Sequence, residues 1–265
     1  DVTVDYTLTV TRKAVTVKAD NKSKVFGEKD PELTATVEGT LGKDTVEYTL
    51  SRKAGEDVGT YTITPSGKAE QTNYKVTYVA GTLTITKAET MTLTPELTGK
   101  DAEKEYDSKP LSGGATASVT KGTTITYSTD DGKTWSETLP SITNVGTLNV
   151  KAKAENKNYK DVTVDYTLTV KHRNVTVTGN NGNKVYGEAD PELTATVAGT
   201  LGKDKVKYTV ARESGEDVGH YSVIPTGEEI QGNYKVTYKN GDFEITKAEK
   251  MTLTPELTGK DAEKV

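Results

Sequence analysis

The sequence contains no cysteine among its 265 residues. This excludes disulfide frameworks, thiolate metal sites and cysteine nucleophiles. Histidine is almost absent as well, since only His172 and His220 occur. The duplicate positions of these two histidines hold Arg12 and Thr60, so neither position demands an imidazole. No serine, histidine or carboxylate pair stands in a catalytic spacing, and no glycine-rich loop opens a helix. We therefore expect neither an enzyme nor a cofactor.

Positive net charge and long apolar runs are also lacking. Lys and Arg total 34 against 39 Asp and Glu, and the isoelectric point is about 5.3. This balance argues against a surface built for nucleic acid or anionic membrane. No window is apolar enough to span a bilayer. With two Phe and one Trp, the side chains of Val, Leu, Ile and Tyr must fill the interior. We expect several small cores rather than one large core.

A long internal repeat dominates the sequence. The stretch 24–44 returns at 184–204, 91–104 returns at 251–264, and 1–10 returns at 161–170, always 160 residues later. This period is far longer than the roughly 20–50 residues of single solenoid repeats, so it must contain more than one module. We divide it into an A-type module and a B-type module. The predicted boundaries are 1–10 (last strand of a preceding B-type module), 11–88 (A-type), 89–171 (B-type), 172–248 (A-type) and 249–265 (opening of a further B-type module). The chain then represents a window on a longer alternating array.

The modules have the pattern of β-strands. Apolar side chains at Val2, Val4, Tyr6 and Leu8 alternate with polar ones, as in a strand with one buried face. We expect these side chains to pack on a neighbour, either the adjoining A-type module or the terminal strand of another copy.

Turn residues predict three hairpins. Asn240-Gly241 suits a two-residue type I′ turn that would pair Tyr238 with Phe243, and Ala80-Gly81 would keep the same register in the first copy. Asp131-Gly132 is a further hairpin signal. No segment shows a helical period, so we predict an all-β chain of tandem small β-sandwich (Ig-like) modules in an elongated array. The alternative for the A-type modules is a β-grasp fold, whose helix could only occupy the short stretch 44–48.

Acidic residues form the most motif-like cluster. The candidate calcium ligands are Glu28 and Asp30, with Glu188 and Asp190 in the second copy. The structural interpretation, which we favour, is that the nearby glycine makes a turn, the proline starts a strand and the acids stay solvated.

Aromatic residues and glycines are interpreted as structural. Tyrosines recur at matched positions, as a core requires, and we assign packing roles to Tyr74, Tyr78, Tyr234 and Tyr238. Trp135, near Tyr127 and Tyr106, is expected in the core, the alternative being a sugar-stacking platform. Gly81 and Gly241 are assigned to turns. A Lys–Asn isopeptide bond, for instance Lys153 with Asn156 or Asn158, is a further possibility for a surface module.

The order of motifs in the A-type modules resembles the MBG (YGX-type) repeat of bacterial surface proteins. The residues that carry the resemblance are 185–193 (VYGEADPEL), 215–221 (GEDVGHY), 233–238 (NYKVTY) and 244–246 (EIT). The first copy departs at Phe26, where the family usually has Tyr. The B-type module, through 106–111, 126–135 and 144–147, resembles YDG-type Ig-like repeats, with Ser108 where Gly is usual.

This resemblance implies an extracellular setting, on the cell surface or wall of Gram-positive bacteria or in a secreted protein. It implies no catalytic residues. The expected function is a stalk or spacer segment of an adhesin-like protein, and the alternative is that the repeats bind host mucin, glycan or matrix protein with avidity. No nucleic acid or membrane partner is expected, and terminal strands could make head-to-tail contacts.

Overall fold

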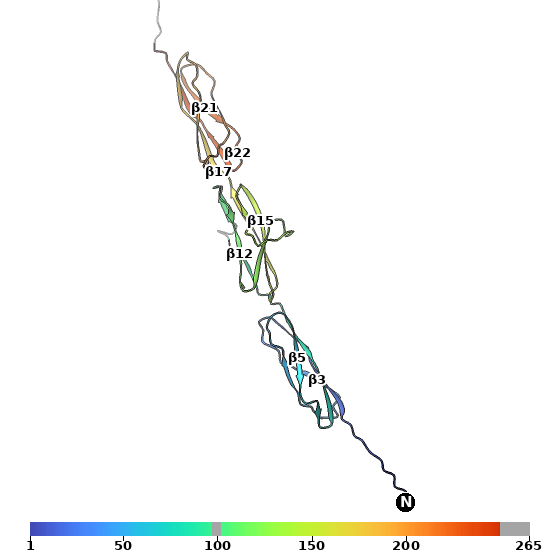
Figure 1. Cartoon of the computed structure of the whole chain (residues 1–265). Helices are drawn as coiled ribbons and strands as arrows, with labels where there is room; N and C mark the ends of the chain where they lie inside the picture. The colour runs from blue at the N-terminus through green and yellow to red at the C-terminus, as the bar shows by residue number, and fades with distance from the viewer. Residues whose placement is uncertain (97–101, 250–265) are drawn as a thin grey trace, which may run out of the picture. The chain divides into compact units, whose positions relative to one another are not determined.

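The structure is a computed structural model that describes residues 1–96 and 102–249 (Figure 1). Within these ranges it contains strands and loops only, and no helix of membrane-spanning length and apolarity. The chain forms two compact units. The described part of the first unit is 1–96, 113–140 and 149–166, and that of the second is 102–112, 141–148 and 167–249.

The first unit contains a pair of four-stranded sheets, here called the first sheet pair. One sheet has the order β3-β1-β7-β6 and the other β2-β8-β5-β4. Strand β5 contacts both β1 and β7, so the sheets face each other. The strands are β1 (Lys13–Ala19), β2 (Lys22–Val25), β3 (Ala35–Glu38), β4 (Thr49–Arg52), β5 (Gly59–Ser66), β6 (Glu70–Gln71), β7 (Tyr74–Val79) and β8 (Gly81–Thr86).

The second unit contains the second sheet pair, with the same topology. Its sheets have the orders β19-β17-β23-β22 and β18-β24-β21-β20. Each strand lies 160 residues after its counterpart in the first sheet pair. The predicted module boundaries stay predictions. The strands are β17 (Arg173–Gly179), β18 (Gly182–Val185), β19 (Ala195–Ala198), β20 (Thr209–Arg212), β21 (Gly219–Thr226), β22 (Ile230–Gln231), β23 (Tyr234–Lys239) and β24 (Gly241–Thr246).

Among the described residues between the two sheet pairs, eight strands occur, here called the middle strands. In the first unit β12 pairs with β9 and β13 with β15, while in the second unit β10 pairs with β16 and β11 with β14. The strands are β9 (Leu93–Glu96), β10 (Ala102–Glu105), β11 (Leu111–Ser112), β12 (Gly114–Ala117), β13 (Thr123–Ser128), β14 (Ser141–Ile142), β15 (Gly146–Asn156) and β16 (Val162–Lys171).

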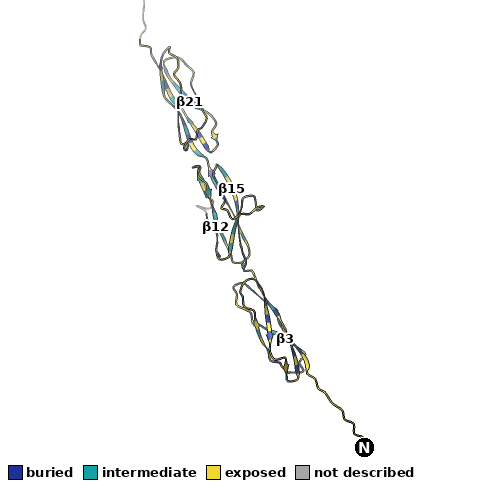
Figure 2. Cartoon of the chain, in the orientation of Figure 1, coloured by how far each residue is buried: buried dark blue, intermediate teal, exposed yellow. Residues whose placement is uncertain are grey.

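The all-β sandwich prediction is confirmed, and the β-grasp alternative is wrong. The stretch 44–48, the only place for the β-grasp helix, forms no helix and leads as a loop into β4. Buried and exposed positions alternate along the strands, as Figure 2 shows, because each strand turns one face to the opposite sheet. Ile63, Leu83 and Ile85 are buried in the core of the first sheet pair, and Val223, Phe243 and Ile245 are buried in that of the second.

The hairpin predictions at Ala80-Gly81 and Asn240-Gly241 are wrong. Strands β7 and β8 belong to different sheets and run on in the same direction. The chain leaves β7 at Val79 and enters β8 at Gly81, and β1 passes into β2 in the same way beside it. Both parallel pairs, β1 with β7 and β2 with β8, keep one register across this switch. Phe243 is therefore buried between the sheets instead of facing Tyr238 across a hairpin.

Close backbone approach explains the glycines at this sheet switch. A Cβ on Gly81 would lie 2.5 Å from the carbonyl oxygen of Ala19, and one on Gly241 would lie 2.2 Å from that of Gly179. Neither glycine has positive φ, so neither serves a type I′ turn. The assignment of Gly81 and Gly241 to turns is therefore wrong, and the close approach of the backbone at the sheet switch accounts for both glycines.

The hairpin signal at Asp131-Gly132 marks a true reversal. Both residues have positive φ, at 62° and 86°. Tyr127 and Ser136 exchange two backbone hydrogen bonds across the loop, at 2.7 and 2.9 Å. The Asp130 carboxylate accepts hydrogen bonds from Ser128 and from the backbone and hydroxyl of Thr134, which holds its pKa well below the usual range.

Residues 1–10 are exposed and form no strand, so the expectation that they pack within this chain is wrong. The side chains of Val2, Val4, Tyr6 and Leu8 are all largely exposed. In the identical sequence at 161–170, residues 162–170 belong to β16, where Tyr166 donates a hydrogen bond to the Gly113 carbonyl. The two copies share a sequence but not these neighbours, and the neighbours decide whether a strand forms.

Candidate functional site

A four-membered ion-pair network joins β2, β4 and their following loops in the first sheet pair. The Lys24 side chain is only 3% exposed, and its ammonium lies 2.7 Å from Asp30 Oδ1 and 2.5 Å from Glu56 Oε2. Arg52 contacts the other oxygen of each carboxylate. Each cation thus bridges both acids, and each acid bridges both cations.

The network recurs in the second sheet pair. Lys184 and Arg212, both nearly buried, contact both Asp190 and Glu216. Hydrogen bonds from Arg212 and then from Lys184 lower the pKa of Asp190 from 3.8 to about 2. The pKa of Lys184 is raised, chiefly by Asp190 and Glu216. The arrangement keeps all four groups charged across the physiological range.

Two of the four candidate calcium ligands take part in these networks. The carboxylates of Asp30 and Asp190 are already shared between a lysine and an arginine. Glu28 and Glu188 instead accept a hydrogen bond from the backbone three residues earlier, at Val25 and Val185. In the described part of the chain, no group of three or more His, Asp or Glu side chains is placed to hold a metal. Calcium binding stays the less favoured hypothesis, and a calcium ion would have to displace the lysine and the arginine from each aspartate.

The four tyrosines combine packing with a hydrogen bond. Tyr74 and Tyr234 are buried, and each hydroxyl contacts an aspartate in the loop before β4 or β20, at 2.5 and 2.6 Å. Tyr78 and Tyr238 are half-buried, and their hydroxyls donate to the carbonyls of Lys68 and Glu228 at 3.0 Å. These contacts are what the predicted packing role requires.

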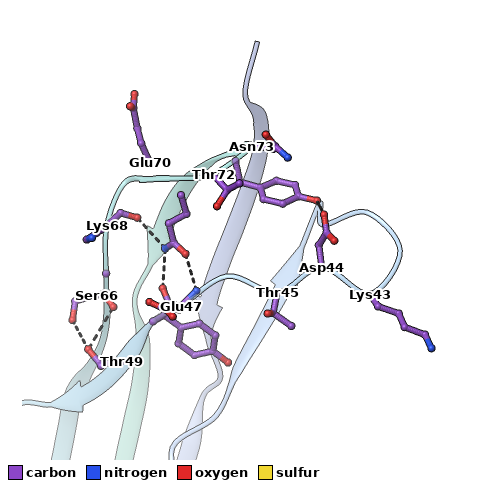
Figure 3. A pocket seen from close by; sticks show the side chains of 14 residues that line it. Lys43, Asp44, Thr45, Glu47, Thr49, Ser66, Lys68, Glu70, Thr72 and Asn73 are labelled. Carbon is purple, nitrogen blue, oxygen red and sulfur yellow. Dashed lines mark hydrogen bonds between the residues drawn. The ribbon is translucent and has the colours of Figure 1, made fainter. Parts of the chain in front are cut away.

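A polar hollow lies beside Tyr74 in the first sheet pair (Figure 3). Its wall is tied together by Gln71, whose amide accepts from the backbone nitrogen of Glu47 at 2.7 Å and donates to its carbonyl at 2.8 Å. Gln231 makes the same two bonds with Lys207 in the second copy, beside a corresponding hollow. Two further pairs in the wall of the first hollow, Tyr74 with Asp44 and Thr49 with Ser66, are also hydrogen-bonded.

Trp135 is half-buried, so its expected place in the core is wrong. Its indole nitrogen donates to the Gly132 carbonyl at 3.0 Å, and the ammonium of Lys153 lies 4.8 Å from the ring centroid. The tight loop at Gly132 holds the ring against the surface of β15. Tyr127 and Tyr106 are buried, so neither offers an open face to a sugar.

Lys153, Asn156 and His220 each have their own local partners. Lys153 also contacts Glu155 at 3.1 Å, whereas the Asn156 amide donates to the Lys121 carbonyl and to Thr123. His220 Nδ1 lies 3.0 Å from Asp242, and this carboxylate raises the pKa of the imidazole.

A contact surface that the sequence patterns do not predict lies at the end of the first sheet pair. The Asn158 amide, in the loop between β15 and β16, accepts from the Val58 backbone nitrogen and donates to the Asp57 carboxylate, both at 2.9 Å. The neighbouring Tyr159 packs edge-to-face on Phe26, with ring centroids 5.5 Å apart. The only available signal was the recurrence of Asp-Val at 57–58 and 217–218.

A second contact surface lies at the start of the second sheet pair. Asn233 accepts from the Val145 backbone nitrogen at 2.8 Å and donates to Asn144 at 3.1 Å. Tyr106 packs edge-to-face on Tyr234 at 5.7 Å. An asparagine amide and an aromatic pair therefore join the middle strands to each sheet pair, within the first and second units respectively.

Comparison with known proteins identifies the duplicated segment. A family model of the MBG domain (YGX type) matches residues 15–84 and 175–244, which together exceed half of the chain. No curated protein sequence matches the chain.

Solved structures of tandem adhesion domains are similar at low identity. Drosophila N-cadherin EC1-4 is 8% identical over 91% of this chain and 76% of that chain, with a TM-score of 0.28. The N-terminal eight Ig domains of Down Syndrome Cell Adhesion Molecule are 14% identical over 88% and 36%, at 0.33. The insect immune protein hemolin is 13% identical over 89% and 68%, at 0.29. TM-scores this low carry no argument about the fold, which is defined by the strand order of the sheets described above. The duplicated motifs and the family match lead to one conclusion: the chain belongs to the MBG domain (YGX type) family, whose repeat it contains twice.

Proposed function

We propose that this chain is a spacer segment of a bacterial cell-surface or secreted, adhesin-like protein, and that it projects a binding head from the cell wall. The observation that carries the proposal is the junction after β8. The backbone N–H of Ala88, two residues beyond that strand, donates to the backbone carbonyl of Asn158 at 3.0 Å, and the Ala88 carbonyl accepts from the backbone N–H of Lys160 at 2.9 Å. Because both backbone groups of Ala88 are hydrogen-bonded to the segment 158–160, the connection after β8 is not a free linker.

Charged side chains support the same junction. Lys160 contacts Glu89, Lys87 lies 3.3 Å from Asp161, and Lys157 lies 2.9 Å from Asp57. Exposed pairs of this kind contribute little energy singly, so their role here is to fix an orientation together with the Asn158 and Tyr159 contacts. A spacer needs a fixed orientation more than it needs a tight site.

Solution scattering tests the proposal. We expect a large maximum dimension for the native chain, and a broader distribution of dimensions for a variant in which Asn158→Ala and Tyr159→Ala open the junction. Asp217→Ala, at the exposed counterpart of Asp57, is the matched control and should leave the profile unchanged. A compact native particle would contradict the spacer function.

The alternative is that the repeats bind host mucin, glycan or matrix protein. The observation that favours it is the polar hollow beside Tyr74, which recurs in the second copy. Binding to a glycan array would be measured for the native chain and for Gln71→Ala combined with Gln231→Ala. Signal that depends on both glutamines would support ligand binding, whereas equal or absent signal would leave the spacer function.

A further inference from the structure

The end of the second sheet pair carries the same groups that are covered at the end of the first. In the first pair, Phe26, Val58 and Ala88 are buried or half-buried beneath the loop Lys157-Asn158-Tyr159. Their counterparts 160 residues later are Tyr186, Val218 and Ala248, and all three are exposed. Tyr186 is 53% exposed and Val218 is 46% exposed. One surface is thus present twice, once covered and once open.

We propose that the open surface, formed by Tyr186, Asp217, Val218 and Ala248, is a docking site for a further B-type segment (a second copy of residues 89–171), which binds it through its own Lys-Asn-Tyr loop. This proposal goes beyond the spacer function, because the docking site would be used whether the repeats act as a spacer or bind a ligand. The occupant is argued from the first sheet pair, where the same surface already holds this loop.

The chemistry of the open surface matches that loop group by group. Asp57 and Val58 offer a carboxylate and a backbone N–H side by side, and the Asn158 amide meets both with one donor and one acceptor. Asp217-Val218 repeats this pair in sequence. The ammonium of Lys157 also lies 2.9 Å from the Asp57 carboxylate. Asp217 would offer the same carboxylate to the lysine of a docked loop.

The aromatic and backbone parts of the surface also match. The rings of Phe26 and Tyr159 pack edge-to-face at an interplanar angle of 70°, and Tyr186 supplies the ring of Phe26 with a hydroxyl added. Ala88 is paired through both backbone groups, and the segment around it, 86–89 (TKAE), recurs unchanged at 246–249. An aromatic ring, a carboxylate and a short backbone segment together select a loop with Asn beside Tyr, rather than a purely apolar partner.

The absence of cysteine makes the proposal measurable. Val58→Cys and Val218→Cys each introduce a single thiol, whose rate of maleimide labelling reports exposure. In the native chain we expect Val218→Cys to react at least about tenfold faster than Val58→Cys, since opening of a covered site limits labelling. The decisive experiment replaces Val265 by a copy of residues 105–171, which then directly follows Lys264. Because 251–264 repeats 91–104, this completes a second B-type segment.

In the extended chain, labelling of Val218→Cys should slow to the rate of Val58→Cys. Replacing the asparagine of the appended loop by alanine should restore fast labelling. Unchanged fast labelling would overturn the proposal, and slow labelling that ignores the asparagine would overturn the assignment to this loop. Hydrogen exchange checks that the appended strands are protected. Unprotected strands would also count against the proposal, because the second sheet pair would then fail to support a segment that the first supports.

Discussion

The two sheet pairs share a topology and an ion-pair network, but they differ in their cores and in what covers their ends. Leu83 in the first core is replaced by Phe243 in the second. Leu41, at the start of the first pair, is exposed, whereas its counterpart Leu201 packs with Tyr106 and other residues of the second unit. The fold of each pair is therefore set by its own residues, while exposure at its ends is set by the neighbour that each end meets.

The core substitution should give the largest effect. Phe243→Ala should cost about 3–5 kcal/mol and Leu83→Ala about 2–5 kcal/mol of unfolding free energy, since both side chains are fully buried and removal leaves a cavity. Chemical denaturation followed by hydrogen exchange would assign each loss to its own sheet pair. A loss that spreads equally to both pairs would break the view that each has an independent core.

The sheet switch should be the next most sensitive place. Gly81→Ala and Gly241→Ala should each cost about 1–3 kcal/mol, because the new methyl group meets a backbone carbonyl that cannot move aside easily. Gly219→Ala is the control, because nothing lies within 4 Å of a Cβ at that position. Thermal melting would compare the three variants, and equal melting temperatures would argue against the close approach.

The ion-pair networks should make both copies sensitive to acid in the same way. The folded-state pKa of Asp190 lies below its ordinary value, so its contribution to stability is complete above pH 3.8 and is lost as the pH falls toward about 2. Asp190→Asn and Asp30→Asn should each lower the melting temperature by several degrees at neutral pH and flatten the acid dependence of their own sheet pair. An unaltered acid profile would show that other carboxylates govern it.

The smallest effect should come from His220, which the first copy lacks. Its pKa is raised above 6.5 by Asp242, so the stabilisation is complete below 6.5 and is lost as the pH rises through the raised value. The second sheet pair should melt slightly higher at about pH 5 than at about pH 8 relative to the first. His220→Thr, which restores the residue type of Thr60, should abolish this difference. A difference that survives the substitution would assign it to another group.

Local patterns predicted the strands, and they failed where distant neighbours decide the outcome. Alternation at 234–246 correctly indicated β23 and β24, but it could not show that Gly241 switches sheets, because a hairpin and a sheet switch have the same local signal. Trp135 looked like a core residue, yet a tight loop holds it half-buried on the surface. The roles of Asn158 and Asn233 depend on partners about 90–100 residues away, which no local pattern encodes.

The sheet switch has a mechanical consequence. The chain enters each sheet pair through β1 or β17 and leaves it through β8 or β24, and the entering strand continues into β2 or β18, which pairs in parallel with the exit strand. Tension applied to the two ends of a sheet pair would pull these parallel strands in opposite directions along their length. Their hydrogen bonds would then be loaded together in shear, rather than broken one after another as in unzipping. A chain held at both ends would resist extension until a whole ladder failed at once, which is the behaviour of a tether.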